Sequence, residues 1–171
     1  MIKIPEKEGR LSAAKAAHIE AVIAFVKRKT EGYRRDLFAN ISRVMLVSGT
    51  FEDMSARDDW SWLSDFILAD VKTLKQMIDR PELLQFNEFK RMYSDYFSAG
   101  SDKYVDASTK YNAYMFIENL GVTICPYCDE EYLDVVENGN GGKLRTLEID
   151  HFFPKGKYPA LAMCFYNLVP S

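Results

Sequence analysis

The sequence lacks the long apolar runs and the leader pattern that mark membrane and secreted proteins. No stretch approaches the roughly 20 apolar residues that a membrane-spanning helix requires. The first residues, Met-Ile-Lys-Ile-Pro-Glu-Lys-Glu, contain no apolar segment followed by a cleavage site. We therefore expect a cytoplasmic protein that has no membrane partner.

Cysteine is also scarce, with three residues, Cys125, Cys128 and Cys164, in a chain of 171. An odd number this small excludes a disulfide framework, so the close pair is available for metal binding or redox chemistry. Cys164 lies between Met163 and Phe165, and we expect it in the hydrophobic core because an isolated cysteine behaves as a small apolar residue.

The chain has no large excess of charge of either sign. It carries 22 Lys and Arg residues against 25 Asp and Glu residues, a net charge of -3, which argues against a strongly basic nucleic-acid-binding module. What the chain does have is apolar and aromatic residues, at 47% and 13% of the sequence. This composition excludes intrinsic disorder and predicts a soluble globular fold with a real core.

Up to about residue 120 the apolar residues recur at helical spacing. His18 lies in an Ala-rich part of the first such segment, and we expect it at the surface. Glycine and proline separate five predicted helices. These helices run from a cap at Ser12 to near Gly32, from about Leu37 to Gly49, from a capping box at Ser55 and Asp58 to Ile78, from Leu84 to Gly100, and from Tyr111 to Gly121.

After Gly121 the pattern changes to that of a β-hairpin. Two segments with strand character, residues 131–136 and 144–153, flank a loop rich in Gly and Asn at residues 137–143. The sequence therefore predicts a mainly α fold with a small α+β part. The predicted division is a helical domain at residues 1–120 and a second domain at residues 121–171.

The second part contains Cys125-Pro126-Tyr127-Cys128, a pattern with two chemical interpretations. Two thiolates at one turn can form half of a tetrahedral zinc site or a redox-active dithiol. This tetrapeptide is the active-site motif of glutaredoxins, but the residues after it read as a hairpin instead of the helix that fold needs. The acidic run at residues 129–131 also opposes a reactive thiolate, because nearby carboxylates raise its pKa. We therefore favour zinc.

A second motif, Asp150 followed directly by His151, lies at the end of the last predicted strand. Adjacent side chains on a strand point to opposite faces, so one can hold a metal while the other faces a different part of a site. A carboxylate suits a hard cation, and a neutral imidazole can accept a proton from water. Hydrolysis of a phosphodiester is the chemistry that needs both groups.

These motifs resemble the HNH endonuclease family, and more narrowly its zinc-bearing bacterial members, over residues 122–171. The resemblance rests on the Cys-x-x-Cys pair, the hairpin, and the segments Leu147-Glu148-Ile149-Asp150-His151-Phe152-Phe153-Pro154-Lys155 and Asn167-Leu168-Val169-Pro170-Ser171. It implies a ββα-metal finger. In that finger Asp150 would bind a catalytic Mg²⁺ or Mn²⁺ ion, His151 would be the general base and Asn167 would orient it. Cys125 and Cys128 would be half of a structural Zn²⁺ site.

The sequence departs from the family pattern at its end. Family members continue with a second Cys-x-x-Cys and a helix whose Asn or His completes the catalytic metal site, whereas this sequence stops at Ser171. We expect that it is a piece or a split subunit of a longer nuclease, and that its finger is partial.

The resemblance implies a metal-dependent endonuclease that cleaves DNA more readily than RNA, in a family that includes bacterial anti-phage defence proteins. Lys155 and Lys157 are candidate phosphate contacts. The alternative is a catalytically inert interaction module whose helical part docks a partner subunit.

Overall fold

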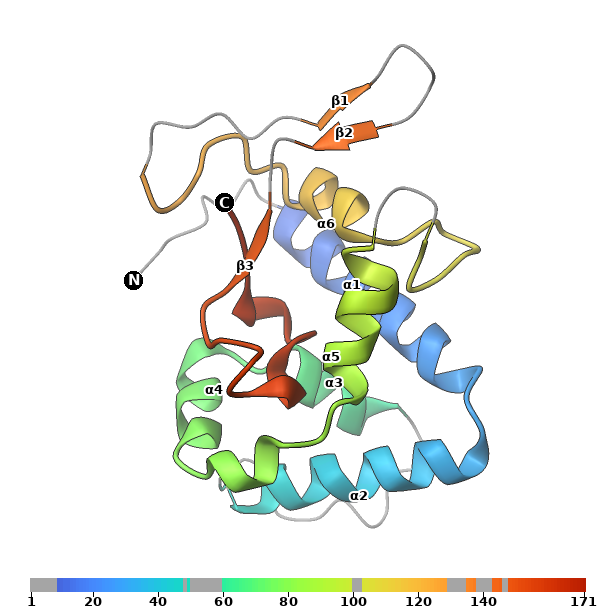
Figure 1. Ribbon diagram of the computed structural model, residues 1–171, viewed down its shortest axis with the longest axis vertical. Coiled ribbons are helices and arrows are strands. Elements are labelled where there is room, and N and C mark those ends of the chain that lie inside the picture. Colours follow the sequence, from blue (N-terminus) through green and yellow to red (C-terminus); the bar gives the residue numbers. More distant parts are fainter. Residues whose placement is uncertain are drawn as a thin grey trace.

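The described chain is mainly helical, and its strands are short and lie after residue 120 (Figure 1). This arrangement confirms the predicted mainly α fold with a small β part. Every described helix is too short or too polar to cross a membrane. The computed structural model describes residues 9–47, 49, 60–99, 103–128, 135–137, 143–145 and 148–171.

The helices form a layered bundle. In Figure 1, α2 (Glu31–Val47) crosses the base of the molecule and α1 (Arg10–Lys27) lies along one side and packs against α6 (Ala113–Leu120). Helices α3 and α4 pack on α2, and α5 packs against the C-terminal segment. The helical elements are α1 (Arg10–Lys27), α2 (Glu31–Val47), α3 (Ser61–Ile67), α4 (Val71–Ile78), η1 (Pro81–Leu84), α5 (Glu88–Met92), η2 (Tyr93–Phe97), α6 (Ala113–Leu120), η3 (Pro159–Leu161) and η4 (Phe165–Asn167).

The boundary between the first two helices differs from the prediction. Helix α1 begins at Arg10 after Gly9, which has a left-handed φ of 87°, so Ser12 lies inside the helix and is not its cap. The helix ends at Lys27, well before Gly32, which belongs to α2. The physical reason is Thr30, whose Oγ1 accepts a hydrogen bond from the Tyr33 backbone N–H at 3.3 Å and so starts a new helix.

The prediction of one long third helix was also wrong, because the described part of this segment forms two helices. Helix α3 ends at Ile67, and Asp70 begins α4 by accepting a hydrogen bond from the Thr73 backbone N–H on its Oδ1 at 2.8 Å. This carboxylate cap interrupts an apolar stripe that otherwise continues at helical spacing. The predicted capping box at Ser55 and Asp58 and the predicted helix end at Gly100 lie outside the described residues.

Two predicted helix ends are confirmed by their backbone conformation. Gly49 follows α2 with a φ of 70°, and Gly121 caps α6 with a φ of 62° while its N–H donates to the Ile117 carbonyl. This left-handed region favours glycine because other residues place a Cβ against the backbone there. At the other end of α6, the Asn112 side chain accepts hydrogen bonds from the Tyr114 and Met115 N–H groups.

In the described part of the chain, four short strands form two separate antiparallel pairs. Strands β1 (Val135–Glu137) and β2 (Lys143–Arg145) pair as the predicted hairpin. The second predicted strand, residues 144–153, is not continuous. Its later part is β3 (Ile149–His151), which pairs with β4 (Leu168–Pro170) at the end of the chain. Residues 131–134, 138–142 and 146–147 of the predicted hairpin lie outside the described chain.

Residues on both sides of position 121 share one hydrophobic core. Three buried hydrogen bonds cross from the helices to the C-terminal segment. The Tyr93 hydroxyl donates to the Ile149 carbonyl at 2.9 Å, and the Cys164 thiol contacts the Phe66 carbonyl at 3.5 Å. Burial of Cys164 confirms that it is a core residue and raises the pKa of its thiol.

The third of these hydrogen bonds comes from His18, which is fully buried, so its expected surface position was wrong. Its Nε2 lies 2.8 Å from the Met163 carbonyl and its Nδ1 lies 2.9 Å from the Tyr111 hydroxyl. The ring also packs edge-on against Phe97, Phe116 and Phe165. Ala14 and Ala21 face the core together with His18, and a neutral imidazole joins α1 to the C-terminal segment.

Candidate active site

The candidate site is built on the antiparallel pair of β3 and β4. His151 lies opposite Leu168 and Asp150 lies opposite Val169 in the ladder. Along β3 the side chains alternate, with Asp150 exposed between buried Ile149 and buried His151. This alternation confirms the prediction that the carboxylate and the imidazole point to opposite faces of the strand.

His151 is 7% exposed and is held from two sides. Its Nε2 lies 3.1 Å from the carbonyl oxygen of Ala162, and its ring packs edge-on against the ring of Tyr93 with centroids 4.5 Å apart. Burial lowers the pKa of the imidazole to about 4, although the hydrogen bond to Ala162 opposes this shift. Because a carbonyl only accepts, Nε2 carries the proton and the lone pair of the neutral ring is on Nδ1.

Asp150 presents its carboxylate to solvent at the edge of the same strand. Oδ1 accepts a hydrogen bond from the His151 backbone N–H at 2.8 Å, and Oδ2 accepts one from the Tyr127 hydroxyl at 3.3 Å. Each carboxylate oxygen has more than one acceptor position, so both oxygens retain capacity for a cation. The Tyr127 contact brings the Cys-Pro-Tyr-Cys turn next to Asp150.

Asn167 is fully buried and holds the segment between β3 and β4 in place. Its Oδ1 accepts from the Phe153 N–H at 2.6 Å, and its Nδ2 donates to the Phe153 carbonyl at 3.1 Å and to the Leu161 carbonyl at 2.9 Å. The Asn167 backbone carbonyl accepts from the Phe152 N–H at 3.0 Å. These bonds fix the chain on both sides of His151, so Asn167 acts on the site through the backbone.

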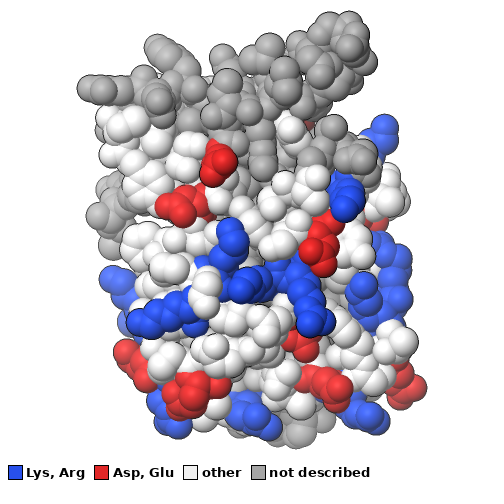
Figure 2. Space-filling view, in the orientation of Figure 1, with Lys and Arg blue, Asp and Glu red and all other residues white. Residues whose placement is uncertain are grey.

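The two candidate phosphate-binding lysines lie in the loop that follows β3. Lys155 places its Nζ 4.5 Å from the ring centroid of Tyr93, the same ring that packs on His151. Lys157 is exposed, and its Nζ lies 5.1 Å from the Tyr158 ring. Figure 2 shows that lysine and arginine side chains gather in a belt across the middle of one face, over this loop and over α5.

The cysteine pair lies on a turn after α6, with Cys125 buried and Cys128 exposed. The three cysteines, all within the described chain, form no disulfide with one another. In the described ranges no three His, Cys, Asp or Glu side chains cluster closely enough to form a metal site by themselves. The donors fit the two metals in kind, since thiolates suit Zn²⁺ and the exposed oxygens of Asp150 suit Mg²⁺.

Sequence reasoning missed two tyrosines at the site. Tyr93 packs against His151 and Tyr127 hydrogen-bonds to Asp150. Tyr93 comes from η2, far from β3 in the sequence, so only the tertiary fold reveals its role. Tyr127 lies inside the Cys-x-x-Cys turn, and the motif assigns a role only to the two cysteines.

The chain matches no protein-family model, no curated protein and no solved structure with which it was compared. The residues of the site are therefore what indicates a function. Together they provide an exposed carboxylate, a buried neutral imidazole in one tautomer, and a cation beside them.

Proposed function

We propose that this chain is a metal-dependent endonuclease of the HNH type that hydrolyses phosphodiester bonds, in DNA more readily than in RNA. The observation that carries the proposal is the pair of adjacent residues on β3. Asp150 is exposed, and the Nε2 of buried His151 is held by the Ala162 carbonyl. This combination supports a carboxylate that binds a metal next to an imidazole that accepts a proton.

His151 is the proposed general base. Its Nε2–H donates to Ala162, so the Nδ1 lone pair is the position that takes a proton from an attacking water. The edge-on ring of Tyr93 and the pinned backbone around Asn167 hold the imidazole in this orientation. Fixed orientation favours proton transfer because little rearrangement remains before the reaction.

Asp150 is the proposed ligand of the catalytic Mg²⁺ or Mn²⁺ ion. Such an ion, when bound, supplies positive charge that stabilises the scissile phosphate and the leaving oxygen. Mg²⁺ is commonly bound through one or two carboxylates and completes its shell with water and phosphate oxygens, so Asp150 would supply one protein ligand in this role. Lys155 and Lys157 are the proposed contacts to neighbouring phosphates.

Cys125 and Cys128 are the proposed ligands of a structural Zn²⁺ ion and would supply two of its four positions. The zinc content of the purified protein tests this assignment. We expect Cys128→Ser to lower the zinc content. A zinc content that does not change in this variant would contradict the assignment.

Metal-dependent nicking of supercoiled plasmid tests the proposed activity. We expect the chain to nick plasmid in the presence of Mg²⁺ or Mn²⁺ and to cleave a matched RNA more slowly. We expect the Asp150→Ala variant to have neither activity. Glu148→Ala is a matched control, because Glu148 is an exposed carboxylate two residues away with no assigned role. The absence of nicking by the wild-type chain would favour the alternative, an interaction module whose helical part docks a partner subunit.

A further inference from the structure

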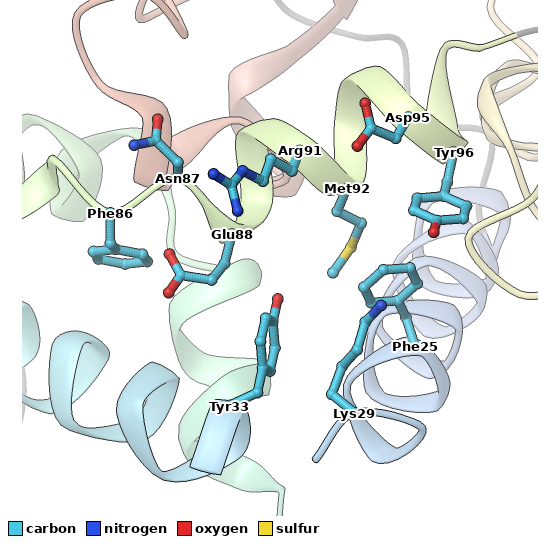
Figure 3. A pocket seen from close by; sticks show the side chains of 10 residues that line it. All are labelled: Phe25, Lys29, Tyr33, Phe86, Asn87, Glu88, Arg91, Met92, Asp95 and Tyr96. Atoms are coloured by element: carbon cyan, nitrogen blue, oxygen red, sulfur yellow. The ribbon is translucent and has the colours of Figure 1, made fainter. Parts of the chain in front are cut away.

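A cavity of about 470 Å³ lies away from His151, on the other side of the helical segment formed by α5 and η2. Figure 3 shows that its side chains come from three regions: the end of α1 with the residues after it, the beginning of α2, and α5 and η2 with the two residues before α5. The proposed nuclease activity does not use this cavity. Its lining combines aromatic rings, two basic side chains and two carboxylates.

The aromatic part of the lining is Phe25, Tyr33, Phe86 and Tyr96. The rings of Phe25 and Tyr96 pack edge-on with centroids 5.1 Å apart, and Tyr96 is 37% exposed. Figure 3 places Tyr33 across the cavity from this pair. Flat aromatic surfaces that remain accessible at the wall of a cavity suit a planar, unsaturated ring.

The basic part of the lining is Lys29 and Arg91. The Lys29 ammonium lies 4.0 Å from the ring centroid of Phe25 and about 6 Å from those of Tyr96 and Tyr33. Arg91 is exposed on α5. Within the described chain neither cation forms an ion pair with a carboxylate. Both are therefore available to an anionic ligand.

The two carboxylates, Glu88 and Asp95, line the same cavity. Burial, with the charge of Glu88 adding to it, raises the pKa of Tyr33 to about 12. Ionised carboxylates only accept hydrogen bonds. A ligand that fills the cavity must therefore also offer N–H or O–H donors.

A ligand of this cavity therefore needs a flat ring for the aromatic wall, an anionic group for the two cations and hydrogen-bond donors for the two carboxylates. A nucleotide has a flat base, an exocyclic amino group that donates, and a phosphate that pairs with the cations.

We propose that this cavity binds a nucleotide, with the base stacked on the aromatic wall, its amino group facing the carboxylates and its phosphate paired with Lys29 and Arg91. The helical segment that lines the cavity also carries Tyr93, the ring that packs on His151. A single strand bound at His151 would follow α5 to the cavity. This placement of the nucleotide within a substrate strand depends on the proposed nuclease function.

Fluorescence anisotropy with labelled oligodeoxyadenylate and the wild-type chain, without added Mg²⁺ or Mn²⁺, tests the proposal. We expect Tyr96→Ala and Arg91→Gln each to weaken binding about tenfold, the size of one lost stacking or phosphate contact. Tyr96→Phe keeps the ring, and Arg35→Gln removes an exposed arginine on α2 outside the cavity. We expect both controls to bind as the wild type does.

Two further measurements distinguish a free nucleotide from a substrate strand and test the role of the two carboxylates. Competition by AMP as effective as competition by the oligonucleotide would support a free-nucleotide site, whereas much weaker competition by AMP would support a substrate strand. Labelled oligothymidylate, whose base has no amino group, is expected to bind more weakly. Equal binding of the two oligonucleotides would overturn the assignment of Glu88 and Asp95.

The outcomes also separate this proposal from the nuclease function. Unchanged oligonucleotide binding by both cavity variants, with nicking that still requires Asp150, would overturn the nucleotide site and leave the nuclease proposal standing. Binding of AMP that depends on Tyr96 and Arg91, in a chain that does not nick, would support the nucleotide site alone.

Discussion

At the residue scale, the environment of His151 depends on the buried side-chain amide of Asn167. Asn167 hydrogen-bonds to the backbone at Phe153 and Leu161, and the Ala162 carbonyl that holds His151 directly follows Leu161. The imidazole is therefore positioned by a chain of backbone groups. The sequence motif identified Asn167, but its mode of action became visible only in the fold.

Asn167→Asp is expected to lower the free energy of unfolding by at least about 2 kcal/mol, because two buried carbonyls lose their donor and meet a carboxylate. Urea denaturation measures this loss. Asn87→Asp is the matched control, since Asn87 is exposed and makes one long hydrogen bond at 3.4 Å. Equal stabilities of the two variants would contradict the positioning role of Asn167.

His18 makes the stability of the protein dependent on pH. Burial lowers the pKa of this imidazole to about 4, whereas in the unfolded chain it titrates near 6.5. The unfolded state therefore binds the proton first as the pH falls. The folded state loses stability between about pH 6.5 and about pH 4, by about 3 kcal/mol in total, and loses no more from His18 below that range.

His18→Gln isolates this contribution because glutamine keeps a donor for the Met163 carbonyl and does not titrate. We expect the variant to be less stable at neutral pH and to lose less stability than the wild type between pH 7 and pH 4. Urea denaturation across this pH range measures the difference. Parallel curves for the two proteins would show that the buried imidazole does not titrate as described.

At the scale of elements, the apolar periodicity predicted that helices dominate but not where they break. Stripes such as Leu37, Ile41, Val44 and Met45 are buried as expected. The break between α3 and α4 depends on one carboxylate cap at Asp70, which an unbroken apolar stripe conceals. The pairing of β3 with β4 joins segments that are distant in the sequence, so local patterns gave no sign of it.

The cap at Asp70 predicts a measurable loss of stability. Asp70→Ala removes the acceptor for the Thr73 N–H and is expected to lower the free energy of unfolding by about 1 kcal/mol. Asp79→Ala, at the opposite end of the same helix, removes an unfavourable charge from the C-terminus and is expected to be neutral or slightly stabilising. Thermal denaturation of the two variants compares them, and a larger loss for Asp79→Ala would contradict the assigned helix boundary.

At the scale of the whole molecule, the shared core couples the helices to the segment that carries the candidate site. Contacts such as His18 to Met163 and Cys164 to Phe66 cross between them. We therefore expect the two parts to unfold together. The composition of the sequence changes at residue 121, but a change in composition does not reveal whether two segments share a core.

Two probes on different parts of the chain test this coupling. Trp60 and Trp62 report on the helices through their fluorescence, and the buried Cys164 thiol reports on the C-terminal segment through its reaction with a thiol reagent. We expect their urea transitions to coincide. Reaction of Cys164 at a urea concentration where the tryptophan signal is still native would indicate two independent units.

The most direct test of the account is metal-dependent plasmid nicking by His151→Ala, with and without added imidazole. If His151 is the base, the variant loses nicking by about a hundredfold or more, keeps its circular dichroism spectrum, and recovers part of its activity when imidazole replaces the missing ring. Nicking by His151→Ala at the wild-type rate would contradict the proposed active site.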